Sequence, residues 1–333
     1  MGDILINKTN HVLKKISQKT SWAPQIIQDV DEIPKGDMPG DIIKIGPKHI
    51  QKAQLIFPKM LELVIPVLEK SPFKRAVIAL CGGSGVGKSE TASLLSYFLN
   101  QTGLGSYTLS GDNYFHRIPR YNDAERLRIF RYSGINGLIF NGLYSLELRD
   151  KLKELQESGK DTHPELVKEY PWLSTYQKEG RRGLKNYLGT NDEINFNELS
   201  SIIYKFKNGE SKIYLKRMGR EESELWYDLL DFSDKNIIII EWTHGNNQNL
   251  QGIDIPILLS STPQETLEHR KARKRDKGVD SSFTTTVLSL EQELIMSQAS
   301  SAKLIISKDG DIITYKDYIR KMMQDWDVEA ENE

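Results

Sequence analysis

Short apolar runs alternate with amphipathic segments along the chain from about residue 75 onward. The run from Arg75 to Cys81 leads into a glycine-rich turn, and residues 236–242 include four consecutive isoleucines. Apolar runs of this length are typical of strands that are buried on both faces of a parallel sheet. Further strands are predicted at 106–110, 254–260, 303–307 and 311–315. Strands that alternate with helices predict an α/β domain with a mainly parallel sheet.

Apolar residues at helical spacing predict the helices between these strands. The predicted helices cover 50–68, 88–99, 139–158, 195–207, 266–277 and 289–299. In the first of them, Pro47 suits the first turn, whereas Pro58 and Pro66 are expected to kink or break the helix.

Three regions have little apolar periodicity. Residues 1–46 are polar and carry scattered prolines and glycines, so we expect an irregular segment with one short helix. Residues 159–192 are also polar and predict an insertion or a mobile segment. The acidic residues 325–333 predict a solvated tail.

Composition narrows the class of protein. The 333 residues carry a formal net charge of -1, which gives no electrostatic reason to expect nucleic acid as a partner. Cys81 is the only cysteine, so no intrachain disulfide forms. We find neither a secretory signal nor an apolar run of the roughly 20 residues that a membrane helix needs. The sequence therefore predicts a cytoplasmic protein without a membrane partner.

Residues 82–89 read GGSGVGKS and satisfy the phosphate-binding pattern G-x-x-x-x-G-K-[ST]. Glycines let backbone N–H groups close around phosphate oxygens, and the following helix N-terminus adds further donors. Lys88 is expected to reach the β- and γ-phosphates of ATP, and Ser89 to bind Mg²⁺. A glycine-rich turn with an exposed lysine is the alternative, but the predicted strand and helix around it favour the cradle. The expected nucleotide-binding residues are Gly82, Gly83, Ser84, Gly85, Val86, Gly87, Lys88, Ser89 and Glu90.

Two carboxylates follow other predicted strands. Asp112 comes after the strand 106–110, and Glu241 ends the isoleucine strand. Ligands of open α/β sheets bind at the carboxyl ends of the strands, so both carboxylates are expected beside the phosphates. Asp112 can accept a hydroxyl proton or bind Mg²⁺, and Glu241 can bind Mg²⁺. Turn formation by Asp112 and strand capping by Glu241 remain the alternatives.

The P-loop together with an aspartate-aromatic cluster resembles the uridine kinase and phosphoribulokinase family, to which pantothenate and glycerate kinases are related in fold. Asp112, Tyr114 and Phe115 resemble the Asp-x-Phe-Tyr motif of uridine kinases. Asp112 with Phe115-His116-Arg117 is close to the Asp-Ser-Phe-His-Arg motif of phosphoribulokinases, with one extra residue. The resemblance implies that Asp112 is the catalytic base.

A basic lid is the second feature that the resemblance implies. Arg270, Arg273 and Arg275 lie on one predicted helix, and Arg275-Asp276 is similar to the end of the family's arginine-rich lid. Arginines there would offset the charge of the transferring phosphoryl group, although a charge run is also typical of a solvated helix face. We expect this lid over residues 266–285.

The region 113–235 is expected to bind the acceptor. Its arginines favour an anionic acceptor, because guanidinium forks match phosphate and carboxylate groups. Residues 188–192 are loosely similar to the acceptor side of pantothenate and glycerate kinases. A hydrogen-bonded structural role is the alternative for the histidine at 244. The candidate substrate residues are Tyr114, His116, Arg117, Arg217 and His244.

Together these features predict a doubly wound sheet with a P-loop NTPase kinase fold, a helical insertion and an N-terminal extension. We expect a mostly helical extension over 1–72 and the kinase domain over 73–333. The expected reaction transfers the γ-phosphoryl group of Mg·ATP to a hydroxyl of a sugar phosphate, nucleoside or hydroxy acid. The resemblance implies a dimer, expected as a homodimer, or a tetramer. The alternative is an ATPase switch that regulates a protein partner. The chain lacks an Asn-Lys-x-Asp element, which argues against a GTPase.

Overall fold

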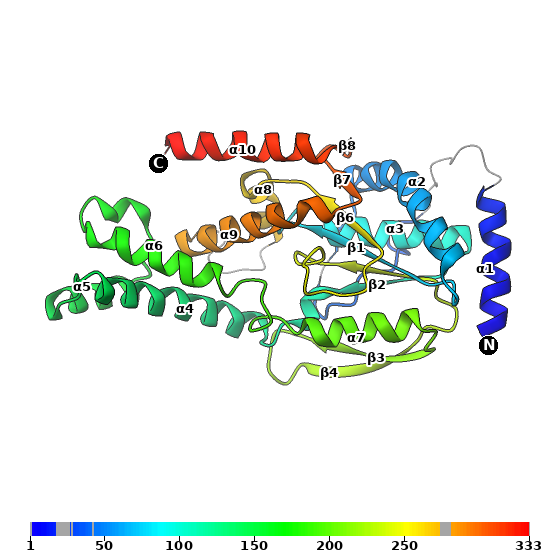
Figure 1. Cartoon of the computed structure of the whole chain (residues 1–333), viewed down its shortest axis with the longest axis horizontal. Helices are drawn as coiled ribbons and strands as arrows, with labels where there is room; N and C mark the ends of the chain where they lie inside the picture. The colour runs from blue at the N-terminus through cyan, green and yellow to red at the C-terminus, as the bar shows by residue number, and fades with distance from the viewer. Residues whose placement is uncertain (1, 18–26, 28, 42, 274–280, 333) are drawn as a thin grey trace.

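The computed structural model describes residues 2–17, 27, 29–41, 43–273 and 281–332. Its centre is a six-stranded sheet in which the first five strands are parallel and the last is antiparallel (Figure 1). In spatial order the strands are β2 (Ser106–Ser110), β5 (Ile237–Glu241), β1 (Ala76–Gly82), β6 (Ile255–Leu259), β7 (Leu304–Ile306) and β8 (Ile312–Ile313).

Both faces of the central strands are buried, as their apolar sequence predicts. Ile237 and Ile239 join one hydrophobic cluster, and Ile238 and Ile240 join another, because successive side chains point to opposite faces. Helices α2 (Pro47–Lys70) and α3 (Lys88–Thr102) cover the first face, and α7 (Phe196–Lys207) covers the second. The predicted doubly wound, mainly parallel α/β fold is thus confirmed.

The prolines do not break α2, which is continuous for 24 residues. A proline inside a helix costs about 3 kcal/mol. The fully buried side chains of Ile56, Met60 and Val64 form an apolar stripe that packs on the core, and Pro58 and Pro66 lie outside that stripe. Burial of such side chains contributes about 1.5–3 kcal/mol each, enough to offset the two prolines.

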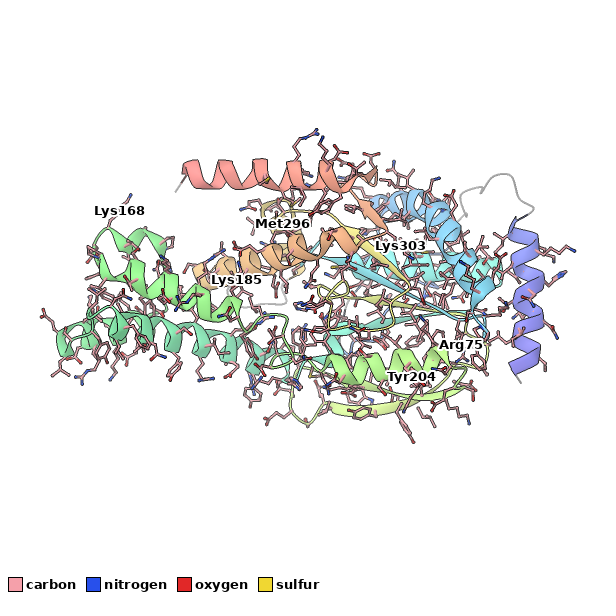
Figure 2. All side chains as sticks on the ribbon, viewed as in Figure 1. Arg75, Lys168, Lys185, Tyr204, Met296 and Lys303 are labelled. Atoms are coloured by element: carbon pink, nitrogen blue, oxygen red, sulfur yellow. The ribbon has the colours of Figure 1, made fainter. Side chains whose placement is uncertain are left out.

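Three helices form an arm beside the sheet (Figure 1). They are α4 (Pro119–Phe140), α5 (Leu146–Glu157) and α6 (Trp172–Lys185), and a short 3-10 helix, η2 (Pro164–Val167), lies between the last two. Figure 2 shows Lys168 projecting from this arm, far from Arg75 at the start of β1. The prediction of a single helix over 139–158 is wrong. In the structure α4 ends at Phe140, and a new helix, α5, begins after its N-cap residue Ser145.

The segment 159–192 is ordered by close packing of α6 against α4, in which a few apolar side chains, Leu173, Tyr176 and Leu184, are buried. Glycines lie where α4 and α6 touch, and a Cβ on Gly134 would stand 2.6 Å from Tyr176. A Cβ on Gly180 would stand 2.9 Å from the ring of Phe130. Glycines that lie against large side chains leave little signal in an apolar pattern, which is why α6 was not predicted.

The remaining elements flank the sheet. An antiparallel hairpin of β3 (Lys212–Met218) and β4 (Leu225–Asp231), which the sequence analysis did not predict, lies beside α7 (Figure 1). The expected acidic tail belongs to helix α10 (Tyr315–Asn332) as far as Asn332. None of the described helices is both long and apolar enough to span a bilayer. The other helices are α1 (Gly2–Ser17), η1 (Gly111–Tyr114), α8 (Pro263–Arg273), α9 (Ser282–Gln298) and η3 (Ala299–Ser301).

Candidate active site

The glycine-rich segment forms a tight turn between β1 and α3. Gly85 and Gly87 have φ angles of 82° and 88°, which L side chains rarely adopt. A Cβ on Gly82 would stand 2.7 Å from the carbonyl oxygen of Leu259. Lys88 folds back over the turn and donates from Nζ to the carbonyl oxygen of Gly83 at 3.0 Å. The backbone thus makes a tight turn directly before a helix N-terminus, which is a geometry that can bind phosphate.

The carboxyl ends of β1, β5 and β2 bring the predicted carboxylates to this turn. Glu241, the last residue of β5, is paired with Leu80 of β1 on one side and with Ser110 of β2 on the other. Ser89, in the first turn of α3, donates from Oγ to Oε2 of Glu241 at 3.0 Å. Asp112 lies two residues beyond β2 and is exposed. Two of the three expected metal ligands, Ser89 and Glu241, are thus in direct contact.

Burial controls the charge of Glu241. Its side chain is 5% exposed, and burial raises its pKa to about 8, with the charge of Asp112 adding to the rise. The charge of Lys88 and the hydroxyl of Ser89 oppose this rise. A buried carboxyl beside a hydroxyl is a hard oxygen donor set, which suits a divalent cation better than a soft metal. A cation there would also favour the ionised carboxylate.

The turn that carries Asp112 passes over an indole ring. A Cβ on Gly111 would stand 2.1 Å from Cγ of Trp242, so only glycine fits there. Trp242 is fully buried and follows Glu241 at the end of β5. The indole ring of Trp242 therefore packs directly against Gly111, the first residue of η1.

A buried ion pair supports the same turn from the other side. Asp37 accepts hydrogen bonds from the backbone amide of Ser110 at 2.7 Å and from Nδ2 of Asn113 at 3.2 Å. Its Oδ2 also accepts from Nη1 of Arg217 at 2.9 Å. Asp112 lies between the two anchored residues, so Asp37 fixes the turn on both sides of it. The sequence analysis missed Asp37 because nothing in the local pattern of residues 1–46 signals this long-range contact.

Three rings, those of Phe115, Trp242 and His244, pack against one another next to this turn. The ring of His244 is edge-on to Phe115 and Trp242, with ring centroids 5.9 Å and 5.3 Å apart. His244 is 1% exposed, and neither ring nitrogen has a hydrogen-bond partner among the described residues. Burial lowers its pKa to about 4, against the opposing charge of Glu193. His244 is therefore a neutral, unpartnered donor and acceptor near pH 7.

A buried charge cluster lies next to His244. Arg126 of α4 donates from Nε to Oε1 of Glu193 at 2.7 Å and from Nη2 to Oε1 of Glu291 on α9 at 3.2 Å. The amide of Gly189 donates to Oε2 of Glu193 at 2.7 Å. Sequence analysis missed all three charged residues. The only available signal was the segment 188–192, which Glu193 directly follows.

The other candidate substrate residues are placed differently. Tyr114 is fully buried in the core under α7. Nε2 of His116 bonds to the carbonyl oxygen of Asn191 at 2.9 Å, and Arg117 donates to the hydroxyl of Tyr187 at 3.0 Å. Arg217 is held in the ion pair behind η1. Roles for these residues in acceptor binding stay predictions.

Part of the predicted basic lid lies over the P-loop. A Cβ on Gly85 would stand 3.0 Å from Cγ of Arg270, and Arg270 donates from Nη1 to Oγ1 of Thr266 at 2.6 Å. Arg273 ends α8, but its side chain and the whole of Arg275 lie outside the described residues. Arg270 is thus the lid arginine that the described structure places against the phosphate cradle.

Comparisons with known proteins agree with this geometry. No family model matches the sequence. Over 239 residues the chain is 37% identical to the bifunctional alpha-galactosidase/sucrose kinase AgaSK of Mediterraneibacter gnavus, and this match covers 72% of the chain. The match covers 20% of the relative, so the chain spans about a fifth of that protein's length. It confirms the predicted resemblance to P-loop small-molecule kinases.

Solved structures give weaker matches. D-glycerate 3-kinase from Cryptococcus neoformans var. grubii has a TM-score of 0.42 and 12% identity, covering 78% of this chain and 98% of that chain. A protein from Bacillus stearothermophilus, described as a possible uridine kinase, has a TM-score of 0.40 and 12% identity, covering 74% and 98%. These scores are too low to decide fold or function, which rest on the strand order and the site geometry.

Proposed function

We propose that this chain is an ATP-dependent kinase that transfers a γ-phosphoryl group to a hydroxyl of a small molecule, with a sugar as the acceptor. The observation that carries the proposal is the convergence of the P-loop, Asp112 and the Ser89–Glu241 contact at one edge of the sheet. The 37% identity to a protein named in part as a sucrose kinase supports a sugar acceptor.

The donor is proposed to be Mg·ATP. Phosphate oxygens would accept from the backbone amides of residues 83–89 and from Lys88. Ser89 and Glu241 would hold Mg²⁺, which neutralises charge on the β- and γ-phosphates. Among the described residues no group of three or more acidic, histidine or cysteine side chains could hold a metal. A small donor set fits Mg²⁺, because this ion takes most of its ligands from phosphates and water.

Asp112 is proposed to act as the general base. The acceptor hydroxyl oxygen forms a bond to the γ-phosphorus while its proton moves to the Asp112 carboxylate. The bond between the γ-phosphorus and the β–γ bridging oxygen breaks, and ADP leaves with that oxygen. Lys88 and Arg270 stabilise the negative charge on the transferring group. Positioning and charge stabilisation supply most of the rate in this chemistry.

ADP release from Mg·ATP tests the proposal. We expect release to depend on an added hydroxylated acceptor and Asp112→Asn to reduce it about 10²–10⁴-fold, while ATP still binds. Asp150→Asn, at an exposed aspartate of α5, is the matched control. Release that ignores every acceptor and survives Asp112→Asn would instead support the ATPase switch.

A further inference from the structure

The outer edge of the β3–β4 hairpin has no partner strand. β4 pairs with β3 over its whole length, Leu225–Asp231, and among the described residues no strand pairs with its other side. Figure 1 shows β4 at the outer margin of the molecule. An unpaired edge leaves a row of backbone N–H and C=O groups, which another strand can bind.

This edge lacks the features that commonly keep an edge strand from pairing. β4 reads LWYDLLD, contains neither proline nor lysine, and pairs with β3 without a bulge. Its two carboxylates are already engaged within the chain. Asp228 accepts from Nε of Arg217 at 3.1 Å, and Asp231 accepts from the backbone amide of Ser233 at 2.8 Å. The strand is therefore suited to pairing.

One face of the hairpin is apolar although it is exposed. Leu225, Tyr227 and Leu229 alternate along β4 and point to the same face, and Tyr214 of β3 lies opposite Leu229. These four side chains are 48–60% exposed. A hairpin of two strands is only marginally stable by itself in water, whereas a sheet of three or more strands is stabilised better. A further strand at this edge would cover part of the apolar surface and enlarge the sheet.

The sequence of β4 is complementary to itself in one antiparallel register. Directly opposite residues of an antiparallel pair point to the same face, so two copies related by a two-fold axis pair with one residue at the centre. With Tyr227 at the centre, Leu225 lies opposite Leu229 of the partner subunit, and Tyr227 lies opposite Tyr227 of the partner subunit. Each apolar side chain on the exposed face of β4 then meets an apolar side chain.

Charges disfavour the neighbouring registers. A centre at Asp228 would place two aspartates directly opposite each other, and a centre at Trp226 would place Asp228 opposite a glutamate, Glu224. Like charges in directly opposite positions are destabilising. With Tyr227 at the centre, Asp228 lies opposite an indole, which is a group that already donates from Nε1 of Trp226 to Asp228 within one chain at 3.1 Å. This self-complementarity favours a second copy of the chain over an unrelated strand.

From the free edge, its apolar face and this register we infer that the chain forms a two-fold dimer. The β4 strands of two copies pair antiparallel about Tyr227 and join the two hairpins into one four-stranded sheet. The inference goes beyond the proposed kinase function and does not depend on it. The interface lies next to the support of the Asp112 turn, because Asp228 bonds to Arg217, the partner of Asp37.

Disulfide trapping tests the register. The two cysteines of Tyr227→Cys would face each other across the two-fold axis with their Cα atoms about 4.5–5.5 Å apart, a separation that a disulfide can span. With diamide as the oxidant, we expect most of this variant to become a disulfide-linked dimer on a non-reducing gel. The hydrogen bond that Tyr227 donates to Glu198 lies at the surface, so the fold should survive its loss.

Leu225→Cys is the matched control for trapping. Its side chain is as exposed as that of Tyr227, but the two cysteines would lie four residues out of register, which is beyond the reach of a disulfide. We therefore expect no cross-linked dimer from this variant. The native Cys81 is buried and stays in both variants.

Sedimentation equilibrium tests the edge itself. We expect the wild type to be a dimer and Leu229→Lys to raise the dimer dissociation constant about 100-fold or more, because a lysine would replace an apolar contact at the edge. Phe140→Lys changes an aromatic side chain that is 89% exposed at the end of α4, and it should leave the dimer unchanged. Far-UV circular dichroism checks the fold of both variants, and Leu225→Lys replaces Leu229→Lys if the latter does not fold.

The outcomes decide the inference separately from the kinase function. A wild type that stays monomeric at about 100 μM would overturn the dimer. Equal cross-linking of Tyr227→Cys and Leu225→Cys would overturn the register, and a dimer that Leu229→Lys leaves intact would overturn the assigned strand. Acceptor-dependent ADP release is measured without reference to the oligomeric state, so a failure of one proposal leaves the other standing.

Discussion

Asp37 and Arg217, 180 residues apart in the sequence, form a 2.9 Å ion pair directly behind the turn that carries Asp112. The pair is almost fully buried, and the hydroxyl of Tyr107 bonds to both partners. The proposed catalytic turn is therefore held by a segment that precedes the P-loop domain and by the β3 strand. Asp37 lies outside the kinase motifs, yet its hydrogen bonds to Ser110 and Asn113 help to position Asp112, the proposed base.

Asp37→Asn is expected to separate positioning from nucleotide binding. The amide keeps the shape but leaves the Arg217 guanidinium without its charge partner, which costs about 3–5 kcal/mol of stability for a buried pair. We expect kcat to fall about 10–100-fold while the KM for ATP stays nearly constant. Chemical denaturation and steady-state kinetics measure the two effects. Asp31→Asn, at an exposed aspartate of the same segment, is the control, and an equal loss there would contradict the role of Asp37.

Glu241→Gln is expected to raise the Mg²⁺ concentration needed for half-maximal activity about tenfold or more, because a carboxylate ligand is lost next to Ser89. A magnesium titration of ADP release at saturating ATP measures the change. Asp254→Asn is a suitable control, since Asp254 lies just before β6, at the opposite edge of the sheet, where it pairs with Lys207. An unchanged magnesium requirement in Glu241→Gln would show that the carboxylate does not bind the ion.

His244 is expected to make stability depend on pH. Its pKa is about 4 in the folded protein and about 6.5 when unfolded, so the unfolded state binds more protons between these values. This contribution is present above pH 6.5 and is lost as pH falls through 4, and it amounts to up to about 3 kcal/mol. The charged groups that act on the ring are those of Glu193, Arg126 and Lys88.

Denaturant unfolding of wild type and His244→Phe between pH 7 and pH 4 tests this expectation. The wild type should lose more stability than the variant over this range, because only the wild type contains the buried imidazole. His11→Gln, at an exposed histidine of α1, controls for the loss of one imidazole. Parallel curves for wild type and His244→Phe would contradict the shifted pKa.

Gly111→Ala is expected to destabilise the protein by about 1–3 kcal/mol and to reduce activity, because its Cβ would overlap the indole of Trp242. In the Trp242→Phe background the same substitution should cost less, and a double-mutant cycle measures the coupling. Gly36→Ala, where a Cβ meets only ordinary contacts, serves as the control. Additive effects of Gly111→Ala and Trp242→Phe would contradict direct contact.

The predictable parts of this protein are those whose signal is local. The buried strand β5, the P-loop and the carboxylates at the strand ends follow from runs of adjacent residues, and the parallel sheet then brings them together. Asp37, Glu193 and Arg126 were not predictable, because each acts through partners that lie far away in the sequence.

Two helices, α2 and α6, differ from what their local sequence predicts because tertiary packing stabilises them. Pro58 and Pro66 predict a broken helix, yet the buried stripe of α2 keeps it continuous. The helix α6 was missed because its apolar positions, Leu173, Tyr176 and Leu184, are few and stand among glycines and charged residues, although they pack with Phe130 of α4 in one hydrophobic cluster. Local propensity is a weak prior where tertiary contacts are dense.

The glycines between α4 and α6 let the two helices pack closely as one rigid unit, with Tyr176 against Gly134 and the ring of Phe130 against Gly180. Arg126 is carried on α4, the same helix as Gly134, and Arg181 and Lys185 of α6 tie this unit to Glu293 of α9. A methyl group at Gly134 would wedge the helices apart and shift Arg126 against Glu193. The buried Arg126–Glu193 pair can therefore be displaced from the arm, by a substitution at a residue that is a partner of neither side chain.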